Sequence, residues 1–133
     1  MGYYTDYTLD VCTATRSEDS FTTANYISPL IKTQLEDEIE KLDVFEGGNC
    51  DDGWYGNAKW YDWEEDMLLL SKRFPEVMLT LGGIGEEFGD IWGAYFCDGR
   101  VQVCKADIVY PPFDPHAMVE KEVNLGGKYS YQQ

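Results

Sequence analysis

Pro75 separates two segments whose apolar residues repeat with different periods, and this change constrains the fold more than any other feature of the chain. Before it, large apolar residues recur three or four positions apart, which predicts one apolar stripe along a helix. The stripe consists of Trp63, Met67, Leu70 and Phe74. After it, apolar residues alternate within 77–81, the period of a strand, and Gly82-Gly83 is expected to end that strand.

The ends of this helix carry matching local features. Asp62, with Glu65 three residues later, is expected to form an N-terminal capping pair. Acidic residues fill the first turn and Lys72-Arg73 the last turn, as the helix dipole favours. Pro75 stops the helix.

A second amphipathic helix is expected earlier in the chain. Ser28-Pro29 can cap and begin a helix. Apolar residues then follow at helical spacing and end near Leu42, so this helix also buries one stripe. The stripe consists of Ile31, Leu35, Ile39 and Leu42.

The remaining patterns predict strands and turns. A first strand is expected over residues 3–14, and a short strand could begin at Val44-Phe45. The glycine-rich acidic run 46–57 is expected to be a loop. Asp98-Gly99 predicts a two-residue hairpin turn between strands at 90–97 and 100–108. In that register Cys97 faces Arg100, Phe96 faces Val101 and Gly93 faces Cys104. One face of the hairpin is then expected in the core, carrying Trp92, Ala94, Phe96, Val101 and Val103.

Together these elements predict an α+β fold, a two-layer sandwich with a mostly antiparallel sheet and two helices on one face. The length of 133 residues fits a single domain spanning residues 1–133, with an extended tail from about 112–133. The outward sheet face, with Met78, Ile91 and Tyr95, is apolar enough to permit a dimer without requiring one.

Negative charge is concentrated in one part of the chain. The formal net charge is −15, and residues 36–66 hold twelve carboxylates against Lys41 and Lys59. Such a field repels nucleic acids and anionic membranes and attracts basic surfaces at long range. The sequence therefore predicts a basic protein partner, with no direct nucleic-acid or membrane binding.

The other features that could carry chemistry are weak. Cys12, Cys50, Cys97 and Cys104 are scattered and the chain has a single histidine, His116, so neither a zinc site nor a disulfide framework is expected. No secretory signal or membrane-spanning run is apparent, and a cytoplasmic protein is expected. We expect no catalytic residues, no metal and no cofactor, and hence no enzyme.

Aromatic residues crowd beside the acidic run, at Trp54, Tyr55, Trp60, Tyr61 and Trp63. Filling of the core accounts for some of them, Trp63 in particular. Exposed Trp and Tyr side chains among carboxylates would instead suit contact with an arginine-rich surface. Both interpretations remain open from the sequence.

The segment 59–102 resembles small phage and prophage proteins of unassigned function. The resemblance lies in KWYD at 59–62, LSKRFP at 70–75, GEE at 85–87 and GDIW at 89–92. A weaker similarity is to a ferredoxin-like domain of plasmid-borne proteins. That family has a tryptophan-rich motif, which residues 54–60 of this chain match only in part. These resemblances imply an accessory protein of a mobile element with a ferredoxin-like sandwich, and they bring no active site.

The leading hypothesis is a non-enzymatic inhibitor from a phage, of the anti-CRISPR type. Its carboxylates would imitate DNA phosphates and occupy the basic groove of a CRISPR effector, a Cas protein or complex. The residues expected to contact the partner are Glu36, Asp37, Glu40, Asp43, Asp51, Asp52, Trp54, Tyr55, Trp60, Asp62, Glu64 and Glu65.

Two alternatives remain open. One is a small metal-binding or ligand-binding module, or an enzyme, that uses the turn formed by Glu86, Glu87 and Asp90 beside Trp92. The other is an acidic protein whose charge serves solubility alone.

Overall fold

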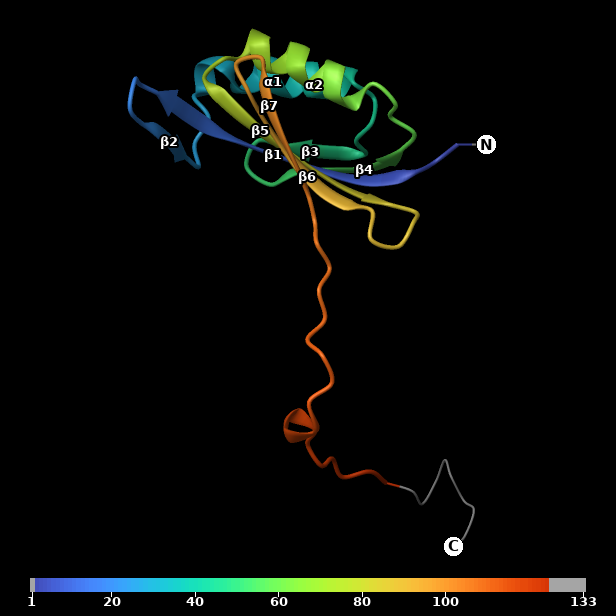
Figure 1. Ribbon diagram of the computed structural model, residues 1–133. Coiled ribbons are helices and arrows are strands. Elements are labelled where there is room, and N and C mark those ends of the chain that lie inside the picture. The colour runs from blue at the N-terminus through green and yellow to red at the C-terminus, as the bar shows by residue number, and fades with distance from the viewer. Residues whose placement is uncertain (1, 125–133) are drawn as a thin grey trace, which may run out of the picture.

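The computed structural model describes residues 2–124, which form one seven-stranded antiparallel sheet with two helices on one face (Figure 1). The other face of the sheet has no helix against it, and the C-terminal segment runs away from that side of the domain. The expected α+β two-layer architecture, with a mostly antiparallel sheet, is confirmed.

The strands follow the order β3-β4-β1-β5-β6-β7, and β2 also pairs with β1. Their bounds are β1 Thr5–Arg16, β2 Phe21–Ala24, β3 Gly47–Asn49, β4 Gly53–Ala58, β5 Val77–Gly85, β6 Ile91–Cys97 and β7 Arg100–Lys105. A ferredoxin-like sheet has four strands, so this sheet does not support that more specific expectation.

Strand β1 lies at the centre and alternates in burial from Thr5 to Asp10. Tyr7 and Leu9 point to the helices and are buried, whereas Asp6, Thr8 and Asp10 lie on the open face. This alternation follows from the two-residue period of a strand.

Each helix begins and ends close to its predicted position. Helix α1 spans Pro29–Lys41, and the Ser28 side chain accepts a hydrogen bond from the Leu30 backbone N–H at 3.2 Å. Helix α2 spans Trp63–Arg73, and its apolar stripe faces the sheet as expected. The predicted capping pair is wrong, because the Asp62 side chain makes no capping hydrogen bond.

The hydrophobic core lies between the helices and the sheet. Its fully buried side chains are Leu9, Leu35, Ile39, Met67, Val77, Leu79, Leu81, Ala94 and Phe96. Ser71 is also buried, and its hydroxyl accepts a hydrogen bond from the Gly99 backbone N–H at 2.9 Å, which ties α2 to the β6–β7 turn. This bond supplies the partner that a buried hydroxyl needs.

The predicted register of the hairpin is confirmed, but Val103, which was expected in the core, is exposed. Cys97 faces Arg100, Phe96 faces Val101, and Gly93 faces Cys104. Asp98 and Gly99 both have positive φ, as the two-residue turn requires. All four cysteines are free thiols.

Two predictions about strands are wrong, and the short strand β2 has no predicted counterpart. The run 46–57 is not a loop, because it forms the β3–β4 hairpin. Strand β5 continues through Gly82-Gly83, where an end was expected. A Cβ on Gly83 would lie 2.3 Å from the Trp92 indole, so the ring can pack here only because residue 83 has no side chain.

The C-terminal segment 106–124 contains no strand and only one short 3-10 helix, Pro115–Ala117. It is extended from residue 106 onward, six residues earlier than the tail was expected to begin, and the predicted positions beyond 124 lie outside the described residues. Within residues 2–124, no helix has the length and apolar character needed to cross a membrane.

The two neighbouring leucines of α2 provide a test of this packing. Leu70 is 5% exposed in the core and Leu69 is 57% exposed. We expect Leu70→Ala to lower the free energy of unfolding by about 2–5 kcal/mol, because it removes packed atoms and leaves a cavity. We expect Leu69→Ala to change it by no more than about 0.5 kcal/mol. Urea denaturation of both variants measures this, and similar losses would contradict the orientation of α2.

Candidate binding surface

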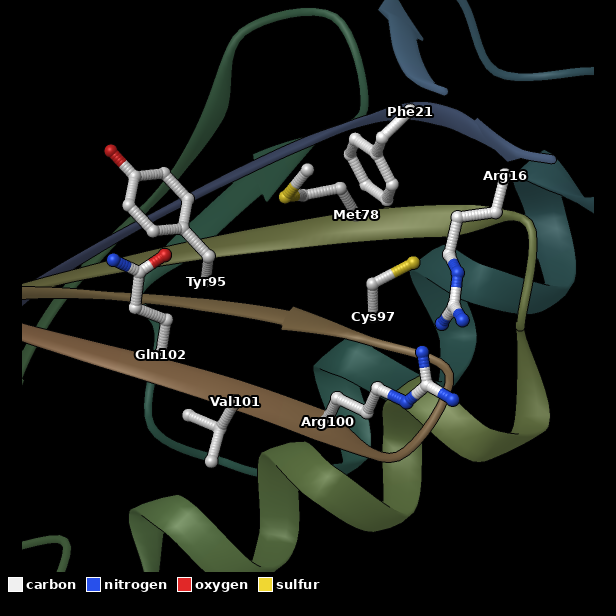
Figure 2. A pocket seen from close by; sticks show the side chains of 8 residues that line it. All are labelled: Arg16, Phe21, Met78, Tyr95, Cys97, Arg100, Val101 and Gln102. Carbon is white, nitrogen blue, oxygen red and sulfur yellow. The ribbon is translucent and has the colours of Figure 1, made fainter. Parts of the chain in front are cut away.

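The molecule presents two different candidate surfaces, one on each side of the sheet. On the open face, a groove of about 590 Å³ lies over β5, β6 and β7, with Met78, Tyr95 and Cys97 in its lining (Figure 2). On the other side, the helices and their flanking segments carry ten of the twelve carboxylates in 36–66. The acidic side was the one predicted from the sequence.

Three of the twelve carboxylates in 36–66 are used to hold the fold together. Glu36 accepts a hydrogen bond from the Cys50 backbone N–H at 2.9 Å. Glu38 pairs with Arg73 at 2.6 Å and with Lys41 at 3.2 Å. Asp66 accepts a hydrogen bond from the Trp60 indole N–H at 2.8 Å. All three are partly buried, so they contribute little to an exposed negative surface.

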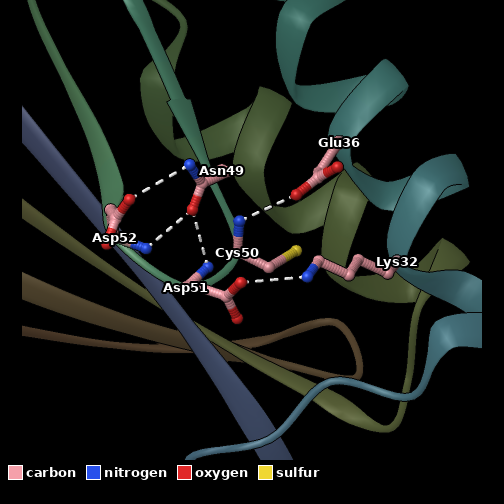
Figure 3. Close-up of polar contacts among 6 residues, drawn as sticks. All are labelled: Lys32, Glu36, Asn49, Cys50, Asp51 and Asp52. Carbon is pink, nitrogen blue, oxygen red and sulfur yellow. Dashed lines mark hydrogen bonds and ion pairs between the residues drawn. The ribbon is translucent and has the colours of Figure 1, made fainter.

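Two more carboxylates shape the β3–β4 turn (Figure 3). Asp51 forms an ion pair with Lys32 of α1 at 3.0 Å, and Asp52 accepts a hydrogen bond from the Asn49 side chain at 3.2 Å. The Asn49 side-chain oxygen in turn accepts hydrogen bonds from the backbone N–H groups of both aspartates. Both aspartates stay exposed, so the turn is anchored to α1 while its charge remains accessible.

The buried thiol in this turn responds to the same charges. Burial, followed by the neighbouring Glu36 carboxylate, raises the pKa of Cys50 to about 12. The Asp51 hydrogen bond raises the pKa of Lys32 above its ordinary value. Cys50 therefore stays a protonated thiol near neutral pH, as a structural cysteine does.

The remaining seven carboxylates of the segment are exposed and make no side-chain hydrogen bond or ion pair with any residue in 2–124. They are Asp37, Glu40, Asp43, Glu46, Asp62, Glu64 and Glu65. All seven lie on the two helices or in the segments that flank them. Their charges are not neutralised within the described chain.

The expectation that Trp54 and Trp60 are exposed contacts is wrong. They are 6% and 8% exposed, and both belong to the core. Trp60 packs edge-on against Tyr7 and against Phe45, with ring centroids 5.3 and 5.9 Å apart. The sequence showed only a crowd of aromatics, whereas the two-residue alternation of Trp54, Gly56 and Ala58 would have placed Trp54 on a buried strand face.

The Trp60 ring nevertheless helps to build the acidic surface. Its contact with Phe45 brings the segment after α1 against the segment before α2. Asp43 and Glu46 lie within two residues of Phe45, and Asp62 lies two residues after Trp60. Acidic residues from two separate parts of the chain are therefore brought to one region.

Tyr55 remains exposed but lies on the opposite side of the sheet from the helices. It pairs with Thr8 on the open face, and its hydroxyl lies 3.4 Å from Asp6, which also accepts a hydrogen bond from Asn57 at 2.7 Å. The Asp6 charge raises the pKa of the Tyr55 hydroxyl. Tyr55 therefore does not join the surface formed by the seven unpaired carboxylates.

The turn proposed for a metal or a ligand is occupied by internal contacts. The Tyr3 hydroxyl donates to Asp90 at 2.8 Å and accepts from the Glu87 backbone N–H at 2.7 Å. The Glu86 carboxylate accepts from the Tyr4 backbone N–H, and Trp92 stacks on Trp63 with centroids 4.4 Å apart. Within residues 2–124, no three potential metal ligands come together.

Comparison with models of known protein families found no match, and comparisons with curated proteins and with solved structures found none either.

Glu38 provides a pH-dependent test of the distinction between structural and unpaired carboxylates. Hydrogen bonding to Lys41, with the nearby Arg73 charge, holds the pKa of Glu38 below its ordinary value of 4.5. A lowered folded-state pKa stabilises the protein above the unfolded pKa, and this contribution is lost as the pH falls through the folded pKa. We expect Glu38→Gln to lower the melting temperature at about pH 7 and to have a smaller effect at about pH 3.

Glu40→Gln is the matched control, since Glu40 lies on the same helix and its side chain has no hydrogen-bond or ion-pair partner within the described chain. It should not lower the melting temperature at either pH. Thermal denaturation followed by circular dichroism makes the comparison, and equal behaviour of the two variants would refute the structural role of Glu38.

Proposed function

We propose that this chain is a non-enzymatic binding protein whose acidic helical side occupies a basic, nucleic-acid-binding surface of a partner protein. The observation that carries the proposal is the set of seven exposed carboxylates without internal partners, gathered on α1, α2 and their flanking segments. A lysine-rich or arginine-rich groove binds DNA phosphates chiefly through charge, so a folded surface of unpaired carboxylates can compete for it.

Two features distinguish this surface from charge that serves only solubility. The carboxylates are concentrated, although solubility is served equally well by charges spread over the whole surface. They also lie beside three carboxylates that are fixed by specific bonds, so the fold uses some acids of the segment for structure and leaves their neighbours exposed and unpaired. Keeping like charges together costs stability through repulsion, and a basic partner would relieve that cost.

The resemblance of segment 59–102 to phage and prophage proteins directs the choice of partner. The specific form of the proposal is an inhibitor of the anti-CRISPR type that competes with target DNA for the groove of a CRISPR effector. The buried tryptophans would act indirectly in this mechanism, since Trp60 positions the acidic segments without touching the partner.

Charge-neutralising variants test whether the position of the carboxylates matters. One variant combines Asp37→Asn, Glu40→Gln, Glu64→Gln and Glu65→Gln. We expect it to weaken binding to a guide-loaded CRISPR effector about tenfold, since four exposed ion pairs at roughly 0.4 kcal/mol each give that factor. The dependence of affinity on salt should also become shallower. Biolayer interferometry at two salt concentrations, with and without target DNA, measures both.

A matched variant makes the same change in net charge away from the helices. It combines Asp10→Asn, Glu18→Gln, Asp19→Asn and Glu87→Gln, all exposed on the open face of β1 or in turns between strands. It should bind like the unmodified protein. The surface assignment fails if both variants bind equally well, and DNA mimicry fails if a saturated effector still takes up its target DNA normally.

A further inference from the structure

The open face of the sheet carries a shallow groove that no element of the domain covers. Phe21 of β2, Met78 of β5 and Tyr95 of β6 supply its apolar lining, and the Phe21 and Tyr95 side chains are substantially exposed (Figure 2). An exposed apolar groove of this kind marks a surface on which another chain can pack.

Two arginines line the same groove beside Cys97. Arg16 is the last residue of β1 and Arg100 the first of β7, and neither pairs with a carboxylate in residues 2–124. In Figure 2 both guanidinium groups point into the space next to the Cys97 sulfur. In a chain with a net charge of −15, two unpaired arginines lining one groove provide a local site for acidic groups.

The C-terminal arm, residues 106–124, has the complementary composition. Its large apolar side chains are between 41% and 81% exposed, namely Ile108, Val109, Tyr110, Phe113, Met118, Val119 and Val123. Its carboxylates are Asp107, Asp114, Glu120 and Glu122, against Lys121 alone. A monomer seldom leaves so many apolar side chains exposed on one segment, so the arm has the composition of a segment that packs on another surface.

The arm runs in a direction that leads away from the groove of its own chain. The arm leaves at Lys105, at the opposite end of β7 from Arg100, and runs away from the sheet (Figure 1). Where the arm leaves the sheet, the Ala106 backbone N–H donates a hydrogen bond to the Ile91 carbonyl at 2.9 Å. Pro111-Pro112 keeps the chain extended, which disfavours a reversal back onto the same sheet.

We propose that the arm of one copy docks in the open-face groove of a second copy. Apolar side chains of the arm would cover Phe21, Met78 and Tyr95, and its carboxylates would meet Arg16 and Arg100. An extended arm of this length reaches roughly 60 Å, far enough to cross a neighbouring sheet. Because whole molecules repel one another at this net charge, the association depends on the local pairing between arm and groove.

Crosslinking through the groove thiol tests the contact directly in the full chain. Ala117→Cys places a thiol in the arm, and Cys97 already lines the groove. Under a mild oxidant we expect a disulfide-linked dimer on a non-reducing gel, which disappears when Cys97→Ala is added. A disulfide confined to single chains would overturn docking on a second copy, and absence of any disulfide involving Cys97 would overturn the groove contact.

A mixing experiment tests the same contact without crosslinking. Phe113→Asp should disable the arm, and Arg16→Glu with Arg100→Glu should disable the groove, so each variant alone should sediment as a monomer. An equimolar mixture should form dimers through the one intact arm and the one intact groove. Lys105→Glu is the charge control on the same strand and should self-associate as the unmodified chain does.

Circular dichroism melting verifies that each variant folds before it is sedimented. The proposal is refuted if the unmodified chain is monomeric at all concentrations tested, or if the two folded variants still self-associate alone. It is also refuted if their mixture remains monomeric. None of these outcomes depends on the acidic helical side, so they do not bear on the proposed function.

Discussion

The fold depends on the central position of β1, which forms backbone hydrogen bonds with β4 on one side and β5 on the other. Its last residues also pair with β2, so one strand joins three others. The partners come from residues 53–58 and 77–85, so the sheet forms only when β1 pairs with strands that are distant in the sequence. Both helices then pack on the face that β1 presents through Tyr7 and Leu9.

The same closure determines which charges remain free. Pairing of β4 with β1 places Trp54 opposite Leu9 in the core, while Trp60, just after β4, packs against Tyr7. Trp60 then orients Asp66 through its indole N–H, and Glu36 and Glu38 are used on α1. The acids that remain are exposed and have no side-chain partner within residues 2–124.

The local parts of the fold were predictable from the sequence. Both helices and the β6–β7 register followed from apolar spacing, Ser28, Pro75 and the Asp98-Gly99 turn, because each of these acts within a few residues. The acidic character of the helical side was equally visible. Within it, the sequence did not distinguish the structural carboxylate Glu38 from its unpaired neighbour Glu40, since the distinction depends on Arg73, thirty-five positions away.

What could not be predicted depended on long-range pairing. The β3–β4 hairpin has the glycine and aspartate content of a loop, and it is a hairpin because β1 supplies a partner for β4. Strand β5 continues through Gly82-Gly83 because both residues pair with β1 and β6, and Trp92 packs over Gly83. Exposure of Trp54 and Trp60 was mistaken for the same reason, since burial of an aromatic is decided by the strand it joins and not by its charged neighbours.

The two sides of the sheet have opposite character, and the two proposals fit together for that reason. The helices occupy one face, and the groove with Arg16 and Arg100 lies on the other. Association through arms and open faces would bury apolar side chains that are now exposed, and it would leave the helices of both copies outward. The unpaired carboxylates would then be presented twice, and two linked copies bind an extended basic surface more tightly than one copy when both can reach it.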